Sequence, residues 1–184
     1  GHPHFEHVAE RTVWTGEASA DDHVGHGSFV AGMIASTYAE CPGFAPGARL
    51  HIYKVFDDRQ TSFTSWFLDA FNYAIQRGVD VLNLSIGGPD FRDEPFVEKV
   101  REIAAAGIVM VSAIGNDGPL FGTLNNPADQ ATVIGVGGID FDNHVAQYSS
   151  RGMSTHGLPA WQGPFKPDVV AYGSHVYGSS RLGG

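Results

Sequence analysis

Short apolar runs of strand length alternate with amphipathic helical patterns along most of this chain. Residues 108–113 read IVMVSA, a nearly continuous apolar run that is typical of a parallel strand covered on both faces. Four further runs, at 50–56, 79–84, 132–136 and 168–171, are also predicted to be strands. Because strands alternate with helices, the sequence predicts an α/β fold with a largely parallel sheet.

Three helices are predicted between these strands. The first follows Gly25, where Phe29, Val30, Met33 and Ile34 have the i, i+3/i+4 spacing of a buried stripe. The second covers 64–77 and ends at Gly78, and the third begins at Pro95 and ends at Gly107. Residues 1–25 are polar and irregular, so no regular element is predicted there.

Composition limits the class of function. The chain has 184 residues, which suits one domain over 1–184, and its 11 Lys and Arg against 20 Asp and Glu give a net charge of −9. A nucleic-acid partner is not expected, because phosphates require clustered cations. No run of about 18 apolar residues is present, so a membrane contact is expected only through segments outside this chain. Cys41 is the only cysteine, which excludes an internal disulfide.

Polar and glycine-rich residues follow two of the predicted strands. Ser85-Ile86-Gly87-Gly88 comes after one, and Ala113-Ile114-Gly115-Asn116-Asp117-Gly118 ends the other. In parallel sheets the chemistry is found beyond the carboxyl ends of the strands. The Asn116 amide is placed to donate to a developing oxyanion, although an asparagine in Asn-Asp-Gly is also a common turn residue.

His26 stands between two glycines at the start of the first predicted helix. The positive end of a helix disfavours an imidazolium, which keeps a histidine neutral and able to accept a proton. A single histidine in this position is more often structural than catalytic, so the residue alone does not establish a function.

Seven segments in order carry a specific resemblance. They read HGSFVAG (26–32), SWFLDAFNYAI (65–75), DVLNLSIGGPDF (80–91), VSAIGNDGPLFGTLNNPADQ (111–130), VIGVGGIDF (133–141), SSRGMS (149–154) and KPDVVAYG (166–173). Together they resemble the subtilisin-like serine protease family, most closely its site-1 protease branch. The resemblance implies the three-layer subtilisin-like α/β fold, in which helices flank a mostly parallel central sheet, here truncated at both ends.

The resemblance also implies roles for individual residues. His26 matches the general base, and Asn116 matches the oxyanion-hole asparagine. Ser85, Ile86, Gly87 and Gly88 match the strand that pairs with the substrate, whereas Ala113, Ile114, Gly115 and Asn125 match the primary specificity pocket. The family's aspartate and nucleophilic serine match nothing between residues 1 and 184. We therefore expect this chain to be a partial peptidase domain that is inactive by itself.

The same resemblance implies a protein or peptide substrate and a parent protein in the secretory pathway, in the endoplasmic reticulum or Golgi. No cofactor is expected for the chemistry and no metal ligand is assigned, although calcium often stabilises this family. Acid-rich loops at Asp21, Asp22, Asp90 and Asp93 are candidate partners for an arginine upstream of the cleaved bond.

Two other functions remain open at this point. One is a metal-dependent hydrolase, suggested by the clustered His2, His4 and His7 and by His23 with His26, but no further ligand pattern completes a zinc site. The other is a non-catalytic domain that binds peptides at residues 85–88. The flanking sequence of the parent would separate this second reading from a protease.

Overall fold

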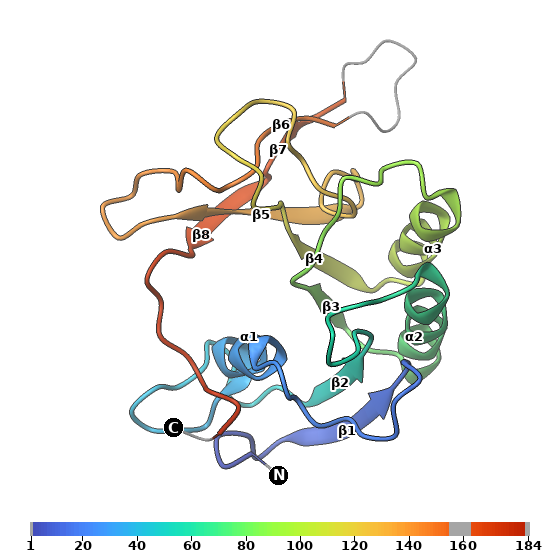
Figure 1. Cartoon of the computed structure of the whole chain (residues 1–184), viewed down its shortest axis with the longest axis vertical. Coiled ribbons are helices and arrows are strands. Elements are labelled where there is room, and N and C mark those ends of the chain that lie inside the picture. The colour runs from blue at the N-terminus through green and yellow to red at the C-terminus, as the bar shows by residue number, and fades with distance from the viewer. Residues whose placement is uncertain (1, 155–162, 183–184) are drawn as a thin grey trace. The chain divides into compact units, whose positions relative to one another are not determined.

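The computed structural model describes residues 2–154 and 163–182 (Figure 1). The chain forms two compact units. The first contains residues 1–70 and 177–184, and the second contains residues 71–176. None of the helices in the described part has the length and hydrophobicity needed to cross a lipid bilayer.

The first unit contains a two-stranded parallel sheet of β1 (Val8–Val13) and β2 (Leu50–Lys54), with Val13 opposite Lys54. The prediction that residues 1–25 lack a regular element is therefore wrong. The strand β1 shows no apolar alternation because part of its pairing is polar, with Glu10 Oε1 2.6 Å from Nδ1 of His51 on β2. Such polar cross-strand pairs stabilise a sheet without an apolar signature in the sequence.

The helix α1 (His26–Ala35) also belongs to the first unit. The stripe that was predicted to be buried is only half-buried, whereas Gly32 and Ala35 are buried. The residues of this stripe are Phe29, Val30, Met33 and Ile34. The segment 177–182 lies against this helix, because a β-carbon at Gly32 would lie 2.4 Å from Ser179 Oγ and one at Gly178 would lie 2.7 Å from the Phe29 ring. The helix thus contacts this segment through both Gly32 and Phe29.

The second unit is built on a four-stranded parallel sheet in the order β3-β4-β5-β8. These strands are β3 (Val81–Leu84), β4 (Val109–Ala113), β5 (Val133–Ile139) and β8 (Val169–Tyr172). Each of the four overlaps a predicted run, and β5 extends to Ile139, beyond the predicted end at residue 136. The sheet confirms the α/β class predicted from the sequence. A short antiparallel pair, β6 (Gly152–Met153) with β7 (Phe165–Lys166), was not predicted.

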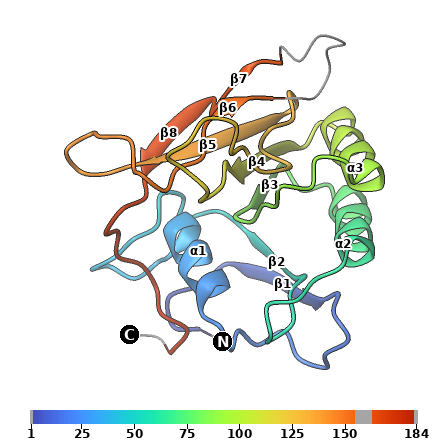
Figure 2. The same cartoon turned by 45° about the horizontal axis from the view of Figure 1, so that its top comes forward.

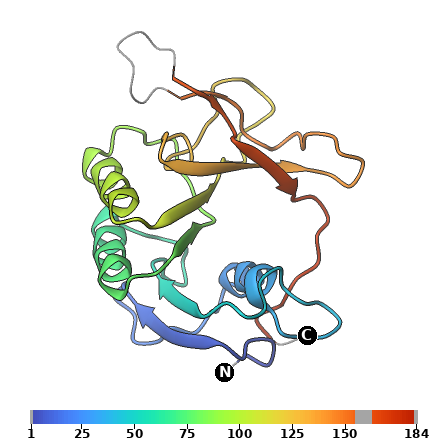
Figure 3. The ribbon, with the colours of Figure 1, turned by 180° about the vertical axis from the view of Figure 1, so that it is seen from behind.

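The helices α2 (Thr64–Arg77) and α3 (Glu94–Ala105) are shown in Figures 2 and 3; all of α3 and residues 71–77 of α2 belong to the second unit. The rings of Phe71 and Phe96 join them at a centroid distance of 5.6 Å. Both helices end where predicted, because Gly78 and Gly107 adopt the left-handed conformation, with φ of 63° and 83°.

The sheet of the second unit buries one of its faces. Met110 is 1% exposed and Val133 is 2% exposed, whereas Val109 and Ile134, which point to the other face, are 47% and 40% exposed. The expectation that residues 108–113 are covered on both faces is therefore not met. The carboxyl ends of β3 and β4 lie next to each other, with Leu84 opposite Ser112, which brings the two predicted polar segments together.

Candidate active site

His26 is the first residue of α1, and its side chain is exposed. The turn before it depends on Gly25, whose φ of 103° is unfavourable for any residue with a β-carbon. The start of the helix has no capping side chain at Gly25 itself. The cap comes instead from Asp22, three residues earlier.

The Asp22 carboxylate accepts four hydrogen bonds from this turn. The donors are the backbone N–H groups of Val24 (3.0 Å), Gly25 (2.7 Å) and Ser28 (2.8 Å) and the hydroxyl of Ser28 (2.8 Å). Partial burial of the carboxyl raises its pKa, but the hydrogen bonds from Gly25, Ser28 and Val24 together outweigh it, so the pKa of Asp22 lies below its ordinary value. We therefore assign Asp22 to the turn that presents His26 and withdraw it as a partner for a substrate arginine.

A second charged network in the first unit surrounds Lys54. Its ammonium donates to Asp58 and contacts Glu17, both at 2.7 Å, and His23 Nδ1 lies 2.5 Å from Asp58. Burial lowers the pKa of Lys54, but its two carboxylate partners raise it by more, and the hydrogen bonds from Lys54 and His23 hold the pKa of Asp58 below its usual range. His23 is thus paired with a carboxylate on the surface.

Two of the other histidines considered for a zinc site, His2 and His4, also have hydrogen-bonding partners. His2 Nε2 lies 2.6 Å from the carbonyl oxygen of Ser180, and His4 Nδ1 lies 2.8 Å from Ser179 Oγ. Neither predicted histidine group brings three ligand atoms together in the part of the chain that the structure describes. These contacts fasten the first residues of the chain to the segment 177–182.

The polar segments of the second unit form a pocket of about 250 Å³. It is lined by Ser85, Ile86, Gly87, Ala113, Gly115, Asn116, Asp117 and Asn125. Seven of these eight residues belong to the set that the sequence identified. The eighth residue, Asp117, lies in the polar segment 113–118 that the sequence singled out, but no role was assigned to it.

Two of the predicted substrate-binding residues do not line this pocket. Ile114 is 1% exposed, and its side chain belongs to the core. Gly88 forms an antiparallel bridge with Asn126, in which the backbone N–H of each residue donates to the carbonyl of the other, at 3.2 and 2.8 Å. Because Gly88 already uses both backbone groups, we limit the segment available to an added strand to residues 85–87.

Asn116 and Asn125 differ in what surrounds them. The Asn116 side chain is exposed and makes no hydrogen bond within residues 2–154 and 163–182. Asn125 is 6% exposed, and its Nδ2 donates to Asp117 Oδ2 at 2.7 Å and to the carbonyl oxygen of Thr123 at 3.2 Å. The first amide is thus available to a ligand, whereas the second is part of the pocket wall.

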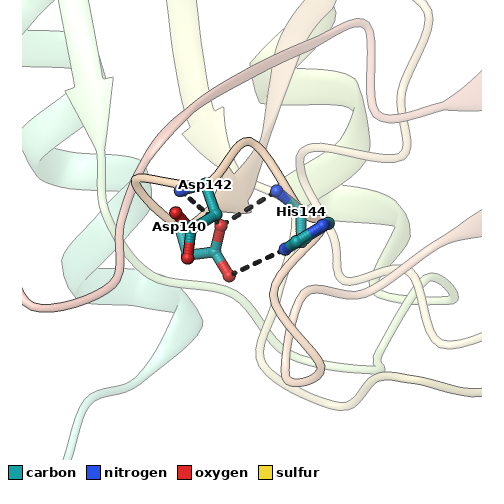
Figure 4. A group of neighbouring side chains, drawn as sticks. All are labelled: Asp140, Asp142 and His144. Carbon is teal, nitrogen blue, oxygen red and sulfur yellow. Dashed lines mark hydrogen bonds and ion pairs between the residues drawn. The ribbon is translucent and has the colours of Figure 1, made fainter.

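A separate group of side chains lies after β5, where Asp140, Asp142 and His144 bring three possible ligand atoms within 4.8 Å of one another (Figure 4). Asp140 Oδ1 accepts hydrogen bonds from the backbone N–H groups of Asp142 (3.0 Å) and His144 (2.9 Å). Because these hydrogen bonds form a turn that accounts for the grouping, we assign the cluster no part in the candidate active site.

Comparison with known proteins adds to this geometry. The family model described as "Subtilase family" matches residues 5–183. The human "Membrane-bound transcription factor site-1 protease" is 65% identical over 183 residues, which cover 100% of this chain and 17% of that protein. "Subtilisin-like protease SBT6.1" of Arabidopsis thaliana is 65% identical over 97% of this chain and 17% of its own length.

Among solved structures, "Sphericase" matches with a TM-score of 0.80 and 26% sequence identity, over 93% of this chain and 61% of its own. The chain therefore spans about a sixth of the length of these two curated relatives and 61% of the Sphericase chain.

Proposed function

Because the chain belongs to the subtilase family, we propose that it is the central part of the catalytic domain of a serine endopeptidase that cleaves peptide bonds in protein substrates. The observation that carries the proposal is the pocket at the carboxyl ends of β3 and β4, which has an exposed asparagine amide at its rim and glycine on its walls. This arrangement suits acyl transfer, in which an oxyanion develops next to a bound side chain.

In this proposal His26 is the general base. It takes the proton of a serine hydroxyl as the oxygen attacks the substrate carbonyl, and later gives the proton to the leaving amine. Its exposure at the start of α1 and the rigid turn fixed by Asp22 support the role. The serine nucleophile and the aspartate that orients the imidazole are supplied by the parent polypeptide outside residues 1–184.

Asn116 is the oxyanion donor in the same proposal. Its side-chain amide, free of other hydrogen bonds in the described residues, donates to the tetrahedral oxygen. In subtilisin, a member of this family, removal of the corresponding kind of donor costs about 10²–10³ in kcat. The backbone of residues 85–87 pairs with the substrate as an added strand, and the side chain before the cleaved bond enters the pocket.

The finer features of the proposal follow the site-1 protease relatives. We propose processing of precursor proteins in the secretory pathway, with any membrane attachment outside this chain. The chemistry needs no cofactor, and calcium, if bound, has a structural role only. By itself the chain is inactive, since removal of the serine alone costs about 2 × 10⁶ in kcat in subtilisin.

The test is peptide hydrolysis by the full-length parent. His26→Ala is expected to lower kcat by about 10⁶, and Asn116→Ala by about 10²–10³ with KM little changed. His144→Ala, on an exposed turn of the second unit, is the control and is expected to retain activity. Hydrolysis within about tenfold of wild type by His26→Ala would refute the assignment. A parent that binds peptides without cleaving any would instead be a pseudoprotease.

A further inference from the structure

One polar side chain interrupts the apolar run at residues 108–113, that of Ser112. It lies on the buried face of the sheet together with Met110 and Ile114, and all three residues are 1% exposed. A hydroxyl that is buried among apolar side chains costs free energy unless it finds a hydrogen-bonding partner. An alanine would fill this position without that requirement, so the partner of the hydroxyl is what distinguishes Ser112.

The hydroxyl of Ser112 donates to the neighbouring strand β3 and to the segment that follows it. Its Oγ lies 3.0 Å from the carbonyl oxygen of Leu84, the last residue of β3, and 3.4 Å from that of Ile86. The single hydroxyl hydrogen is shared between these two acceptors. Because the pairing of β3 with β4 ends at Leu84 opposite Ser112, the side chain extends the contact with β4 into residues 85–87.

This contact determines which way the backbone of residues 85–87 faces. In an extended chain, the backbone groups of alternate residues point to the same side. Leu84 and Ile86 both direct their carbonyl oxygens toward Ser112, so the backbone groups of Ser85, between them, point to the opposite side. Within the described residues, no backbone group of 85–87 hydrogen-bonds to another backbone group. The edge that faces away from Ser112 is therefore available to an added strand.

A different contact holds the segment at its other end. Gly88 forms the antiparallel bridge with Asn126, through two backbone hydrogen bonds of 3.2 and 2.8 Å. Residues 85–87 thus lie between a backbone bridge on one side and a side-chain hydroxyl on the other. A change of side chain removes the hydroxyl but not the backbone groups of the bridge, so Ser112 is the point at which a substitution can release the segment.

From these contacts we infer that Ser112 is a positioning residue, which holds residues 85–87 in the extended geometry that an incoming peptide needs. The inference rests on the proposed function, in which this segment pairs with the substrate. Ser112 is 1% exposed and does not line the pocket, so it acts only through the backbone that it holds. Its effect should therefore increase with the number of substrate residues that pair with the segment.

The experiment uses the full-length parent and the p-nitrophenyl esters of acetyl-leucine and acetyl-Ala-Ala-Ala-Leu. The three added alanines lengthen the backbone and carry only methyl side chains, so the ratio of the two kcat/KM values measures the contribution of backbone pairing. Wild type is expected to prefer the longer ester. Ser112→Ala is expected to lower this preference by roughly 3–10-fold, the factor that corresponds to the net free energy of one buried hydrogen bond.

Two further variants separate positioning from general stability. Ser112→Cys keeps a side chain of similar shape with a weaker donor and is expected to lose part of the preference; it replaces Ser112→Ala if that variant does not fold. Ser36→Ala is the matched control, because Ser36 is also 1% exposed and its hydroxyl oxygen accepts from the backbone N–H of Tyr38 at 3.2 Å. It is expected to leave the ratio of the two kcat/KM values unchanged, whatever its effect on stability.

Hydrolysis with an unchanged ratio in Ser112→Ala, with an equal fall for both esters, or without a wild-type preference for the longer ester overturns the inference and leaves the proposed function standing. Binding of fluorescein-labelled Ala-Ala-Ala-Leu is measured in parallel by fluorescence anisotropy. No hydrolysis, together with binding that Ser112→Ala weakens and Ser36→Ala does not, refutes the protease and supports the inference. No hydrolysis, together with unchanged binding or no binding, refutes both.

Discussion

The turn that precedes His26 provides the most specific prediction about the stability of the protein. Asp22→Ala removes the acceptor of four hydrogen bonds at the start of α1. Loss of a capping side chain costs about 0.5–2 kcal/mol, and hydrogen bonds to a charged acceptor lie at the upper end of the usual range. Because Val24 is exposed and Gly25 and Ser28 are half-buried, water replaces part of what is lost. We therefore expect a loss of about 2 kcal/mol in the free energy of unfolding.

This loss should depend on pH. The pKa of Asp22 is lowered by folding, so its ionised form contributes stability that is complete above the unfolded value near 3.8 and disappears as the pH falls through the lower folded value. The difference between wild type and Asp22→Ala should therefore be constant from pH 7 to about pH 5 and shrink in more acidic solution.

The assay is chemical denaturation of the full-length parent, followed by a signal from this domain, at pH 7 and at steps down to pH 3. Asp22→Asn is a useful second variant, because its side-chain oxygen can still accept hydrogen bonds from Val24 and Gly25, whereas its side-chain nitrogen cannot accept one from Ser28. It is expected to lower the free energy of unfolding by about half as much as Asp22→Ala does. Asp142→Ala is the control, with a change below about 0.5 kcal/mol. Equal stability of Asp22→Ala and wild type at pH 7 would show that the turn does not depend on this carboxylate.

Two further substitutions, one in each unit, test contacts between buried residues. The Lys166 side chain is 1% exposed, and its ammonium donates to the carbonyl oxygen of Val133 at 2.7 Å and to Asp168 at 2.5 Å. Lys166→Met removes this ammonium and is expected to lower the free energy of unfolding, measured by chemical denaturation, by about 2–3 kcal/mol. A decrease below about 0.5 kcal/mol would contradict the prediction. Gly32→Ala puts a methyl group against Ser179 and is expected to lower stability by about 1–3 kcal/mol. Because Ser179→Gly also removes the contact with His4, the loss is compared in the two backgrounds and is expected to be smaller in Ser179→Gly than in wild type. An equal loss in both backgrounds would show that the two residues do not compete for space.

The elements that the sequence predicted well are those fixed by local rules. The helix α3 has a 3.6-residue apolar period and ends at a glycine with positive φ, and its start is marked by Pro95 with Asp93 accepting from the N–H of Phe96 at 3.3 Å. Each of these signals lies within a few residues of the structure that it specifies, so no knowledge of the tertiary fold is needed to use it.

The features that the sequence did not predict depend on partners far along the chain. The strand β1 is stabilised in part by a contact between Glu10 and His51, 41 residues apart, and the small-residue packing of α1 depends on Ser179 near the other end of the chain. The apolar periodicity of a single segment contains no information about such contacts. The apolar period of α1 predicts a buried stripe that includes Phe29, but it gives no sign that Gly32 packs against Ser179.

The candidate site depends both on local sequence signals and on contacts between residues that are far apart in the chain. The position of the pocket follows from a local rule, that polar residues at the carboxyl ends of adjacent parallel strands meet at one edge of the sheet. Its lining does not, because Asn125 returns to the pocket from a loop, lies against both Gly87 and Gly115, and donates a hydrogen bond to Asp117. Gly87 and Gly115 have no side chains, so these two positions by themselves would predict an open slot between the strands. In the structure these glycines make room for the Asn125 side chain, because a β-carbon at either position would lie less than 3 Å from it.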